Sequence, residues 1–324
     1  FYMDIFNISD VRKFEAEALK IYRHQAKNNK VYKQFLDLIK IDPLTVNKIE
    51  KIPFLPVEFF KSHQILSNKD QVARTFSSSG TSGSVQSQHF VTDLKIYEES
   101  FKRGFEYFYG NIEDYTVLAL LPGYLEREGS SLIYMVDQLI KDSRSKDSGF
   151  YLNELDQLSE LLTTLDSGGN KVLLIGVTYA LLDLIEDHTF KLNNTIVMET
   201  GGMKGKRKEL IRSELHKILS DGFGLEDIHS EYGMTELLSQ AYSKGGGIFQ
   251  SPPWMKIMIR DTEDPFHHLS YGRTGGINII DLANINSCSF IATQDLGRKI
   301  SEEKFEILGR FDHSDIRGCN LMVV

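Results

Sequence analysis

Apolar runs and helix-spaced segments alternate through the middle of this chain of 324 residues, and this alternation constrains the fold most. Short apolar runs typical of buried strands lie at Tyr115–Leu121, Lys171–Ile175 and Thr195–Glu199, and Asp227–Glu231 is predicted as a further short strand. The segments between them carry apolar residues at helical spacing, over 130–140, 152–165, 179–187 and 206–220. Strands that alternate with helices predict an α/β fold, with a parallel sheet flanked by helices on both faces.

The two ends of the chain have sequence patterns that differ from that of the middle. Residues 9–50 are charged and helical in pattern, and a proline-punctuated boundary follows at 52–57. After residue 245 come short strand patterns with Gly and Pro turns, at 257–260, 276–281, 289–293 and 305–308. We therefore predict an N-terminal helical segment packed on the core (1–76), an α/β core (77–244) and a small β-rich C-terminal subdomain (245–324).

Composition narrows the class of protein. A net charge of −8 and scattered Lys and Arg argue against nucleic acid as a partner. Two cysteines in so long a chain give no disulfide framework, and a reducing cytoplasm fits best. No apolar run approaches the roughly 18 residues that span a bilayer, so we expect no integral membrane segment.

Residues 77–84 read Ser-Ser-Ser-Gly-Thr-Ser-Gly-Ser and predict a phosphate-handling loop. Glycine allows a positive φ and a close approach to a ligand. Successive backbone N–H groups in such a turn form an anion-binding nest, and the hydroxyls add donors. The spacing of Gly80 and Gly83 is not that of a Walker A loop. A flexible Ser/Gly linker is the alternative.

Two other sequence patterns are weaker evidence for a catalytic or metal site. Gly176-Val177-Thr178-Tyr179-Ala180 resembles a nucleophile elbow, but Thr stands in place of Ser and Ala in place of the last Gly, which argues against a hydrolase. His267 and His268 lack a third ligand at metal spacing, and His89 is expected to be structural.

Four further segments follow the loop in a fixed order. They are Glu199-Thr200-Gly201-Gly202, Glu231-Tyr232-Gly233-Met234-Thr235-Glu236, Ala292-Thr293-Gln294-Asp295 and Gly309-Arg310-Phe311-Asp312. Together with residues 77–84 they resemble the core motifs of the adenylate-forming superfamily, which includes acyl-CoA synthetases and luciferases. The resemblance implies the large N-terminal domain type of that superfamily.

A narrower resemblance rests on three other segments. Leu121–Glu126, Ser130–Met135 and Arg317-Gly318-Cys319 look like the LuxE-type acyl-protein synthetases, which activate fatty acids in bacterial bioluminescence systems. This resemblance covers nearly the whole chain, except for about the first fifty residues.

The resemblance implies a site for ATP and Mg²⁺. The loop residues Ser78, Ser79, Gly80, Thr81, Ser82 and Gly83 would hold the β- and γ-phosphates. Tyr232 with Gly233 would lie against one face of adenine, and Gly201-Gly202 would pack on the other. Thr235 would contact the α-phosphate and Glu236 would hold Mg²⁺, a cation that prefers oxygen ligands. Asp295, supported by Arg310, would bind the ribose hydroxyls.

The implied reaction is attack of a carboxylate on the α-phosphorus, which gives acyl-AMP and pyrophosphate. The catalytic residues would be Thr81, Thr235, Glu236 and Cys319. Cys319, beside Arg317, would accept the acyl group as a thioester, whereas Cys288 is expected to be inert. The substrate is a small carboxylic acid, with fatty or other apolar acids preferred. Leu132, Ile133, Met135 and Tyr124 are candidates for the acyl pocket, although core packing explains them equally well.

Two departures from the superfamily keep alternatives open. No Lys follows the glycines of the loop, and only fourteen residues follow Arg310, which leaves no room in this chain for the C-terminal lid domain of most members. We therefore retain two alternatives. One is an acyl-CoA ligase that needs a lid-supplying or acyl-accepting protein partner. The other is a non-catalytic relative that binds a nucleotide or a partner.

Overall fold

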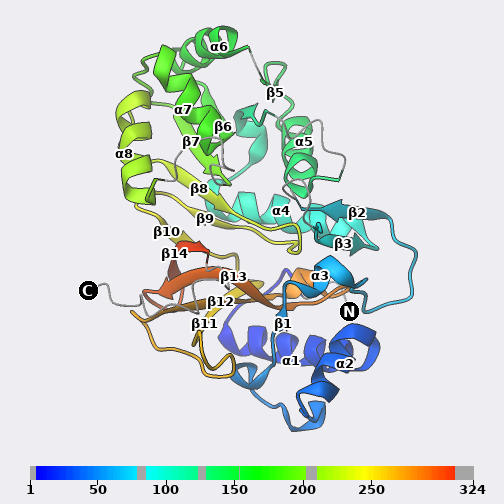
Figure 1. Cartoon of the computed structure of the whole chain (residues 1–324). Coiled ribbons are helices and arrows are strands. Elements are labelled where there is room, and N and C mark those ends of the chain that lie inside the picture. The colour runs from blue at the N-terminus through cyan, green and yellow to red at the C-terminus, as the bar shows by residue number, and fades with distance from the viewer. Residues whose placement is uncertain (1–4, 79–84, 123–128, 153, 202–209, 311–324) are drawn as a thin grey trace. The chain divides into compact units, whose positions relative to one another are not determined.

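The computed structural model describes residues 5–78, 85–122, 129–152, 154–201 and 210–310, and the chain divides into two compact units (Figure 1). The first unit comprises residues 1–74, 87–92 and 253–324, and the second comprises 75–86 and 93–252. The predicted N-terminal segment thus shares a unit with most of the predicted C-terminal subdomain. The three predicted domains, 1–76, 77–244 and 245–324, stay a prediction.

The second unit contains a mixed sheet with a parallel centre. Its strands follow the order β5 (Gly149–Phe150), β4 (Tyr115–Leu120), β6 (Lys171–Val177), β7 (Thr195–Thr200), β8 (His229–Tyr232), β9 (Ala241–Ser243) and β10 (Ile248–Gln250). The first five are parallel, and β9 and β10 continue the sheet in antiparallel fashion. All six residues of β4 are buried, which explains why the strands read as continuous apolar runs.

Five helices cover this sheet. They are α4 (Leu94–Tyr109), α5 (Ser131–Ser143), α6 (Leu155–Ser167), α7 (Thr178–Asp187) and α8 (Arg212–Phe223). Figure 1 shows α4 and α5 on one side of the parallel strands and α7 and α8 on the other. Asp93 caps α4 by accepting a hydrogen bond from the Lys95 backbone N–H, and Ser130 caps α5 in the same way through Ile133.

The first unit is an antiparallel sheet backed by helices. Strands β11 (Met255–Arg260), β12 (Thr274–Asp281), β13 (Phe290–Lys299) and β14 (Lys304–Arg310) pair in sequence, and β1 (Leu55–Pro56) adds parallel to β13. Strand β3 (Gln88–Val91) also belongs to this unit, while β2 (Arg74–Ser77) starts at its boundary. The helices of the described part of this unit are α1 (Val11–Asn28), α2 (Lys30–Leu38) and α3 (Phe59–Ser62). Short 3₁₀ turns among the described residues are Pro43–Thr45, Ile49–Lys51 and Leu282–Asn284 in this unit and Ile112–Asp114 in the second.

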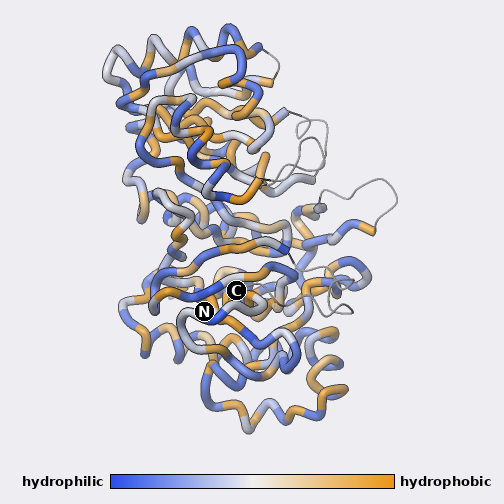
Figure 2. The backbone as a smooth tube through the Cα atoms, turned by 60° about the vertical axis from the view of Figure 1, so that its left-hand side comes forward, coloured by the Kyte–Doolittle hydropathy of each residue, from blue (hydrophilic) through white to orange (hydrophobic). Residues whose placement is uncertain are grey.

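Helices α1 and α2 pack against the sheet of the first unit through aromatic rings and through the buried side-chain amide of Gln25. The rings of Tyr22 and Tyr32 lie 5.9 and 6.2 Å from that of Phe290 in β13. Buried Gln25 donates hydrogen bonds to the carbonyls of Asn284 and Ile285 and accepts one from the Ser289 N–H. Hydrophobic and hydrophilic residues alternate along the helices (Figure 2), as expected where one helical face is buried.

The predicted α/β fold, with its β-rich C-terminal part, is confirmed. Of the predicted helix 206–220, residues 206–209 lie outside the described part of the chain; α8 begins at Arg212, because Ile211 is extended (φ −67°, ψ 146°) and the buried stripe begins only at Leu215. Strand β13 runs six residues beyond the predicted end at Thr293, since polar residues there hide the strand pattern. No helix among the described residues is long and apolar enough to cross a membrane.

Candidate functional site

The carboxyl ends of β7 and β8 bring two of the predicted segments together. The strands are parallel, with Thr200 opposite Glu231, so Gly201 and Tyr232 follow at neighbouring strand ends. The Thr200 hydroxyl donates a 2.5 Å hydrogen bond to Glu231 Oε2 and ties the two ends. Ligands of open α/β sheets bind beyond the carboxyl ends of the strands, which makes this edge the candidate site.

Three carboxyl groups, of Glu199, Glu231 and Glu236, are buried at this edge. Glu199 Oε1 accepts a hydrogen bond from Arg212 Nη1 at 3.0 Å and lies 3.4 Å from His216 Nε2. Burial raises the pKa of Glu231 to about 7; the Thr200 hydrogen bond lowers it, and the charge of Glu199 raises it further. A carboxyl group that titrates near neutral pH beside a strand end is typical of a functional site.

Tyr232 presents a half-buried aromatic ring at the end of β8. Its ring meets that of Phe249 edge-on at 6.3 Å, and the Arg212 guanidinium lies 4.9 Å from the centre of the Phe249 ring. A Cβ atom at Gly233 would lie 2.5 Å from Glu231 Oε1, so a larger residue at this position would displace the Glu231 carboxylate. These contacts surround the Tyr232 ring and the backbone at Gly233.

Thr235 and Glu236 lie in a turn directly after this glycine. The turn is closed by a 3.1 Å hydrogen bond from the Leu237 N–H to the Met234 carbonyl. Thr235 is half-buried and Glu236 is buried. A hydroxyl and a carboxylate are therefore held within a few residues of the aromatic ring, a donor set that suits a phosphate and a hard cation.

Asp295 and Arg310 pair in the first unit. They are directly opposite each other on β13 and β14, and Arg310 Nε donates to Asp295 Oδ1 at 3.1 Å. The Asp295 side chain is 9% exposed and that of Arg310 is 74% exposed. The structure thus brings these two predicted residues together, and their roles toward a nucleotide stay predictions.

Several predicted residues lie outside the described part of the chain. They are Ser79, Gly80, Thr81, Ser82, Gly83, Tyr124, Gly202 and Cys319. Ser78 is described and follows β2, and Gly201 has a φ of +73°, which favours glycine. In the candidate acyl-pocket segment, Met135 is buried while Leu132 and Ile133 are half-buried.

Sequence reasoning missed Arg212 and His216 as members of the carboxyl-edge cluster. Both come from α8, and they reach Glu199 only because β7 and α8 are adjacent in space. The hydroxyl of Thr178, from the elbow-like pattern, donates to the Gly201 carbonyl at 2.7 Å and so supports the same edge. Cys288 is buried and its pKa is raised to about 12 by burial, in agreement with an inert thiol.

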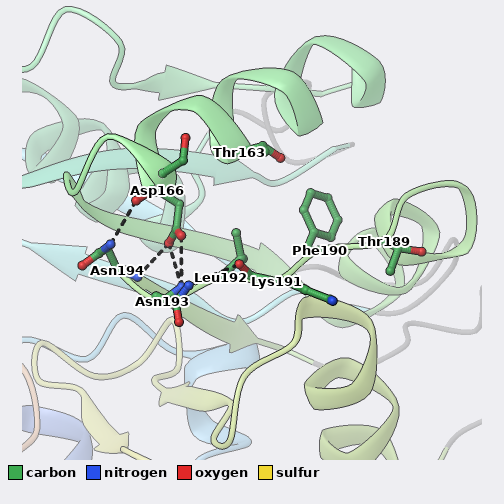
Figure 3. Close-up of a pocket in the computed structure, with 9 residues that line it drawn as sticks. Thr163, Asp166, Thr189, Phe190, Lys191, Leu192, Asn193 and Asn194 are labelled. Atoms are coloured by element: carbon green, nitrogen blue, oxygen red, sulfur yellow. Dashed lines mark hydrogen bonds between the residues drawn. The ribbon is translucent and has the colours of Figure 1, made fainter.

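A cavity of about 430 Å³ lies at the opposite, amino edge of the same sheet (Figure 3). Its lining includes Asp166 at the end of α6 and residues 189–194, which lead into β7. The Asp166 carboxylate accepts hydrogen bonds from the backbone N–H groups of Asn193 and Asn194 and from the Thr195 hydroxyl. These bonds give Asp166 a structural role, so the cavity is a weaker candidate than the carboxyl edge.

No group of three or more His, Cys, Asp or Glu side chains that could hold a metal ion exists among the described residues. Mg²⁺ bound with a nucleotide commonly uses one or two carboxylates together with phosphate oxygens. A single buried carboxylate such as that of Glu236 is compatible with that mode.

Comparison with known proteins agrees with the motif pattern. Residues 6–120 match the model of the family described as acyl-protein synthetase, LuxE. The long-chain-fatty-acid–luciferin-component ligase of Vibrio harveyi is 24% identical over 323 residues, which cover 93% of this chain and 84% of the relative. The predicted resemblance to LuxE-type synthetases is confirmed.

Two solved structures show a similar fold. ATP-bound MatB from Rhodopseudomonas palustris has a TM-score of 0.58 at 16% identity, over 75% of this chain. This chain spans about half of that protein, 49% of its length. The open conformation of 2-hydroxyisobutyryl-CoA ligase, in complex with 2-HIB-AMP and CoA, has a TM-score of 0.65 at 10% identity over 93% of this chain and 70% of that one. At these identities the likeness establishes the fold alone.

Proposed function

We propose that this protein uses ATP to activate a carboxylic acid as acyl-AMP, with release of pyrophosphate, and then transfers the acyl group to a thiol. The observation that carries the proposal is the placement of Gly201 and Tyr232–Glu236 at the neighbouring carboxyl ends of β7 and β8. The resemblance to a fatty-acid ligase and to acyl-CoA ligases supports it. The preferred substrate is a fatty or other apolar acid.

Each predicted residue has a defined part in this proposal. The ring of Tyr232 stacks on adenine, and the backbone at Gly201 and Gly202 lies against the other face of the base. Thr235 donates to the α-phosphate, and Asp295, oriented by Arg310, accepts hydrogen bonds from the ribose hydroxyls. The loop residues Ser78, Ser79, Gly80, Thr81, Ser82 and Gly83 bind the outer phosphates through backbone N–H groups and hydroxyls.

The chemical step is an in-line displacement at phosphorus. A carboxylate oxygen of the substrate bonds to the α-phosphorus, and the bond from that phosphorus to the bridging oxygen of pyrophosphate breaks. The protein contributes positioning and donors aimed at the phosphate oxygens, which is where most of the acceleration of such transfers arises. Glu236 would hold Mg²⁺, whose charge stabilises the phosphate oxygens.

The acyl acceptor in the proposal is Cys319 or a thiol on a partner protein. Attack of a thiolate on the acyl carbonyl forms the thioester and releases AMP. The adjacent sequence Arg317-Gly318 favours the thiolate form by placing a cation near Cys319. The reducing environment of the cytoplasm, inferred from the two cysteines, would keep such a thiol available.

Carboxylate-dependent exchange of pyrophosphate into ATP tests the first half-reaction. Purified protein is assayed with Mg²⁺ over a panel of fatty, aryl and amino acids. We expect exchange with an apolar acid, and we expect Glu236→Ala to abolish it. Measurable ATP binding without exchange for any acid would favour the non-catalytic alternative.

A coenzyme A ligase that uses a lid from another chain is the second catalytic candidate, favoured by the acyl-CoA ligase fold. The Cys319→Ala variant separates the two. Under the main proposal this variant forms acyl-AMP but loses covalent labelling by a radioactive acid. If the variant instead consumes the acid only when coenzyme A is added, the coenzyme A ligase is correct.

A further inference from the structure

Strand β13 bulges at the segment that carries Asp295. Gly276 of β12 pairs with Leu296, and Asn278 pairs with Ala292, so the single residue Ile277 lies opposite three residues of β13, Thr293–Asp295. Bulges interrupt the ladder of backbone hydrogen bonds and re-aim side chains, often beside active sites. The buried carbonyl groups at this bulge therefore need donors from elsewhere.

Arg260 supplies those donors from β11. Its Nη1 donates to the Ile277 carbonyl at 2.8 Å and to Asn278 Oδ1 at 2.8 Å, and its Nη2 donates to the Thr293 carbonyl at 2.6 Å. Arg260 is paired with Gly276 in the ladder, and a Cβ atom there would lie 2.5 Å from the guanidinium carbon. The absence of a side chain at Gly276 thus lets the guanidinium reach across β12 to the bulge.

The Thr293 hydroxyl links Asp295 by hydrogen bonds to the Ile277 carbonyl that Arg260 also contacts. Thr293 Oγ1 donates to the same Ile277 carbonyl at 2.9 Å and accepts from the Asp295 backbone N–H at 3.1 Å. Thr293 and Asp295 are both buried, whereas Gln294 between them is half-buried and donates to Glu58. The backbone N–H of Asp295 is therefore held by a chain of hydrogen bonds that starts at Arg260.

We infer that Arg260, acting through Thr293 and the bulge opposite Ile277, is a positioning residue that aims the Asp295 carboxylate and so sets the preference for a nucleotide with ribose hydroxyls. This inference rests on the proposed function, in which Asp295 binds ribose. It adds a residue of β11 that lies more than thirty positions from Asp295 in the sequence.

A lysine cannot replace this guanidinium. Arg260 makes three hydrogen bonds in two directions from one planar group, and an ammonium group is a point charge without that fork. Burial lowers the pKa of Arg260 to about 10, opposed by the charges of Glu58 and Asp295, so the group stays charged at neutral pH. Arg260→Lys therefore keeps the charge but loses the bridge between the two carbonyl groups.

Calorimetric binding of ATP and of 3′-deoxy-ATP tests the inference, because the ratio of their dissociation constants reports the contact of Asp295 with a ribose hydroxyl. We expect the wild type to prefer ATP by about tenfold or more, the value of a hydrogen bond to a charged group. Asp295→Asn, Arg260→Lys and Thr293→Val should each reduce this ratio by weakening ATP binding, with little change for 3′-deoxy-ATP. In the double variant Arg260→Lys/Asp295→Asn the ratio should fall no further than in Asp295→Asn.

Ser287→Ala is the matched control for a merely structural effect. It removes a buried 2.9 Å hydrogen bond to the Ile65 carbonyl in the same unit, without contact to Asp295, so it should leave the ratio unchanged. If Arg260→Lys does not fold, the nearly isosteric Thr293→Val carries the test.

Folded variants of Arg260 and Thr293 that keep the wild-type ratio, or that weaken both nucleotides equally, would overturn the inference. Failure of the proposed function looks different: the ratio would change as expected while no acid supports pyrophosphate exchange. A wild type that does not distinguish the two nucleotides, or binds neither, overturns the inference as well.

Discussion

The two edges of the parallel sheet in the second unit use buried carboxylates in opposite ways. At the amino edge, Asp166 is saturated by backbone N–H groups and a hydroxyl that close the entry to β7. At the carboxyl edge, Glu199 and Glu231 are buried on neighbouring strands β7 and β8, Glu236 is buried in the turn after β8, and burial raises the pKa of Glu231 to about 7. The cavity lies at the amino edge, and Glu231, the acid with the raised pKa, lies at the carboxyl edge.

This difference shows that cavity volume alone does not identify the site. A carboxylate whose hydrogen bonds are all made within the protein stabilises the fold. Acids buried near one another at a strand end instead destabilise it, and a bound cation or hydrogen-bond donor can offset that destabilisation. Variants at the two edges should therefore affect different properties: stability at the amino edge, and activity or the pH dependence of stability at the carboxyl edge.

The largest expected effect is on stability at the amino edge. Asp166→Ala leaves the N–H groups of Asn193 and Asn194 and the Thr195 hydroxyl without their acceptor. We expect a loss of about 4 kcal/mol in the free energy of unfolding, at about 1 kcal/mol for each part-buried N–H group and about 2 kcal/mol for the buried Thr195 hydroxyl. Urea denaturation measures it. Pyrophosphate exchange should be normal at temperatures where the variant is folded, and lost exchange in the folded variant would break the distinction between the edges.

The next effect is on activity at the carboxyl edge. Glu236→Gln keeps the shape of the side chain but removes the charge proposed to hold Mg²⁺. We expect exchange to fall about 100-fold, equivalent to about 3 kcal/mol in the barrier. Raising the Mg²⁺ concentration should recover part of the rate, and chelation of Mg²⁺ should abolish the exchange of the wild type. A Glu236→Gln enzyme with wild-type rate and Mg²⁺ dependence would remove Glu236 from the site.

A third effect concerns pH. Because the pKa of Glu231 is raised from 4.5 to about 7, the folded state binds an extra proton between these values. The stability from this group is present in full below pH 4.5 and is lost as the pH rises through 7. Its loss should amount to about 2 kcal/mol between about pH 5 and 8.

The difference between wild type and Glu231→Gln isolates this contribution. The pKa of His229 is lowered to about 4, chiefly by burial, and this histidine makes stability rise with pH up to 6.5, in the opposite direction. Both proteins share His229, so subtracting their unfolding free energies at each pH removes it. A difference that does not depend on pH would mean that Glu231 titrates near its ordinary value.

The smallest effect is on ATP affinity. Tyr232→Leu removes the aromatic face proposed to stack on adenine, and we expect about a fivefold weaker dissociation constant, or about 1 kcal/mol. Tyr232→Phe should bind like the wild type, because the Tyr232 hydroxyl lies 3.8 Å from a weak acceptor, Met234 Sδ. Equal affinity in both variants, measured by calorimetry, would argue against stacking.

The sequence was sufficient for the parts of the fold that depend on local pattern. Apolar runs located β4, β6 and β7, because strands buried on both faces need apolar residues, whereas the polar strand β8 contains no such run. The start of α8 at Arg212 could not be predicted in the same way, since the residue before it, Ile211, offers no side-chain cap.

The candidate site was predictable where its residues lie within one segment, as in Tyr232–Glu236. It was not predictable where tertiary contacts define it. The Thr200–Glu231 bond depends on the register of β7 and β8, and the role of Arg260 depends on a bulge two strands away. Neither a propensity nor a motif encodes which residues face each other across a sheet.

The most direct test of the central claim follows the oxygen atoms of the substrate. The acid identified by exchange is labelled with ¹⁸O in both carboxylate positions and incubated with ATP, Mg²⁺ and the wild-type protein, and the products are analysed by mass spectrometry. If the carboxylate attacks the α-phosphorus and the acyl carbon is then attacked, AMP carries one ¹⁸O atom and pyrophosphate carries none. Label in inorganic phosphate, with ADP as the nucleotide product, would mean attack at the γ-phosphorus and would contradict the account.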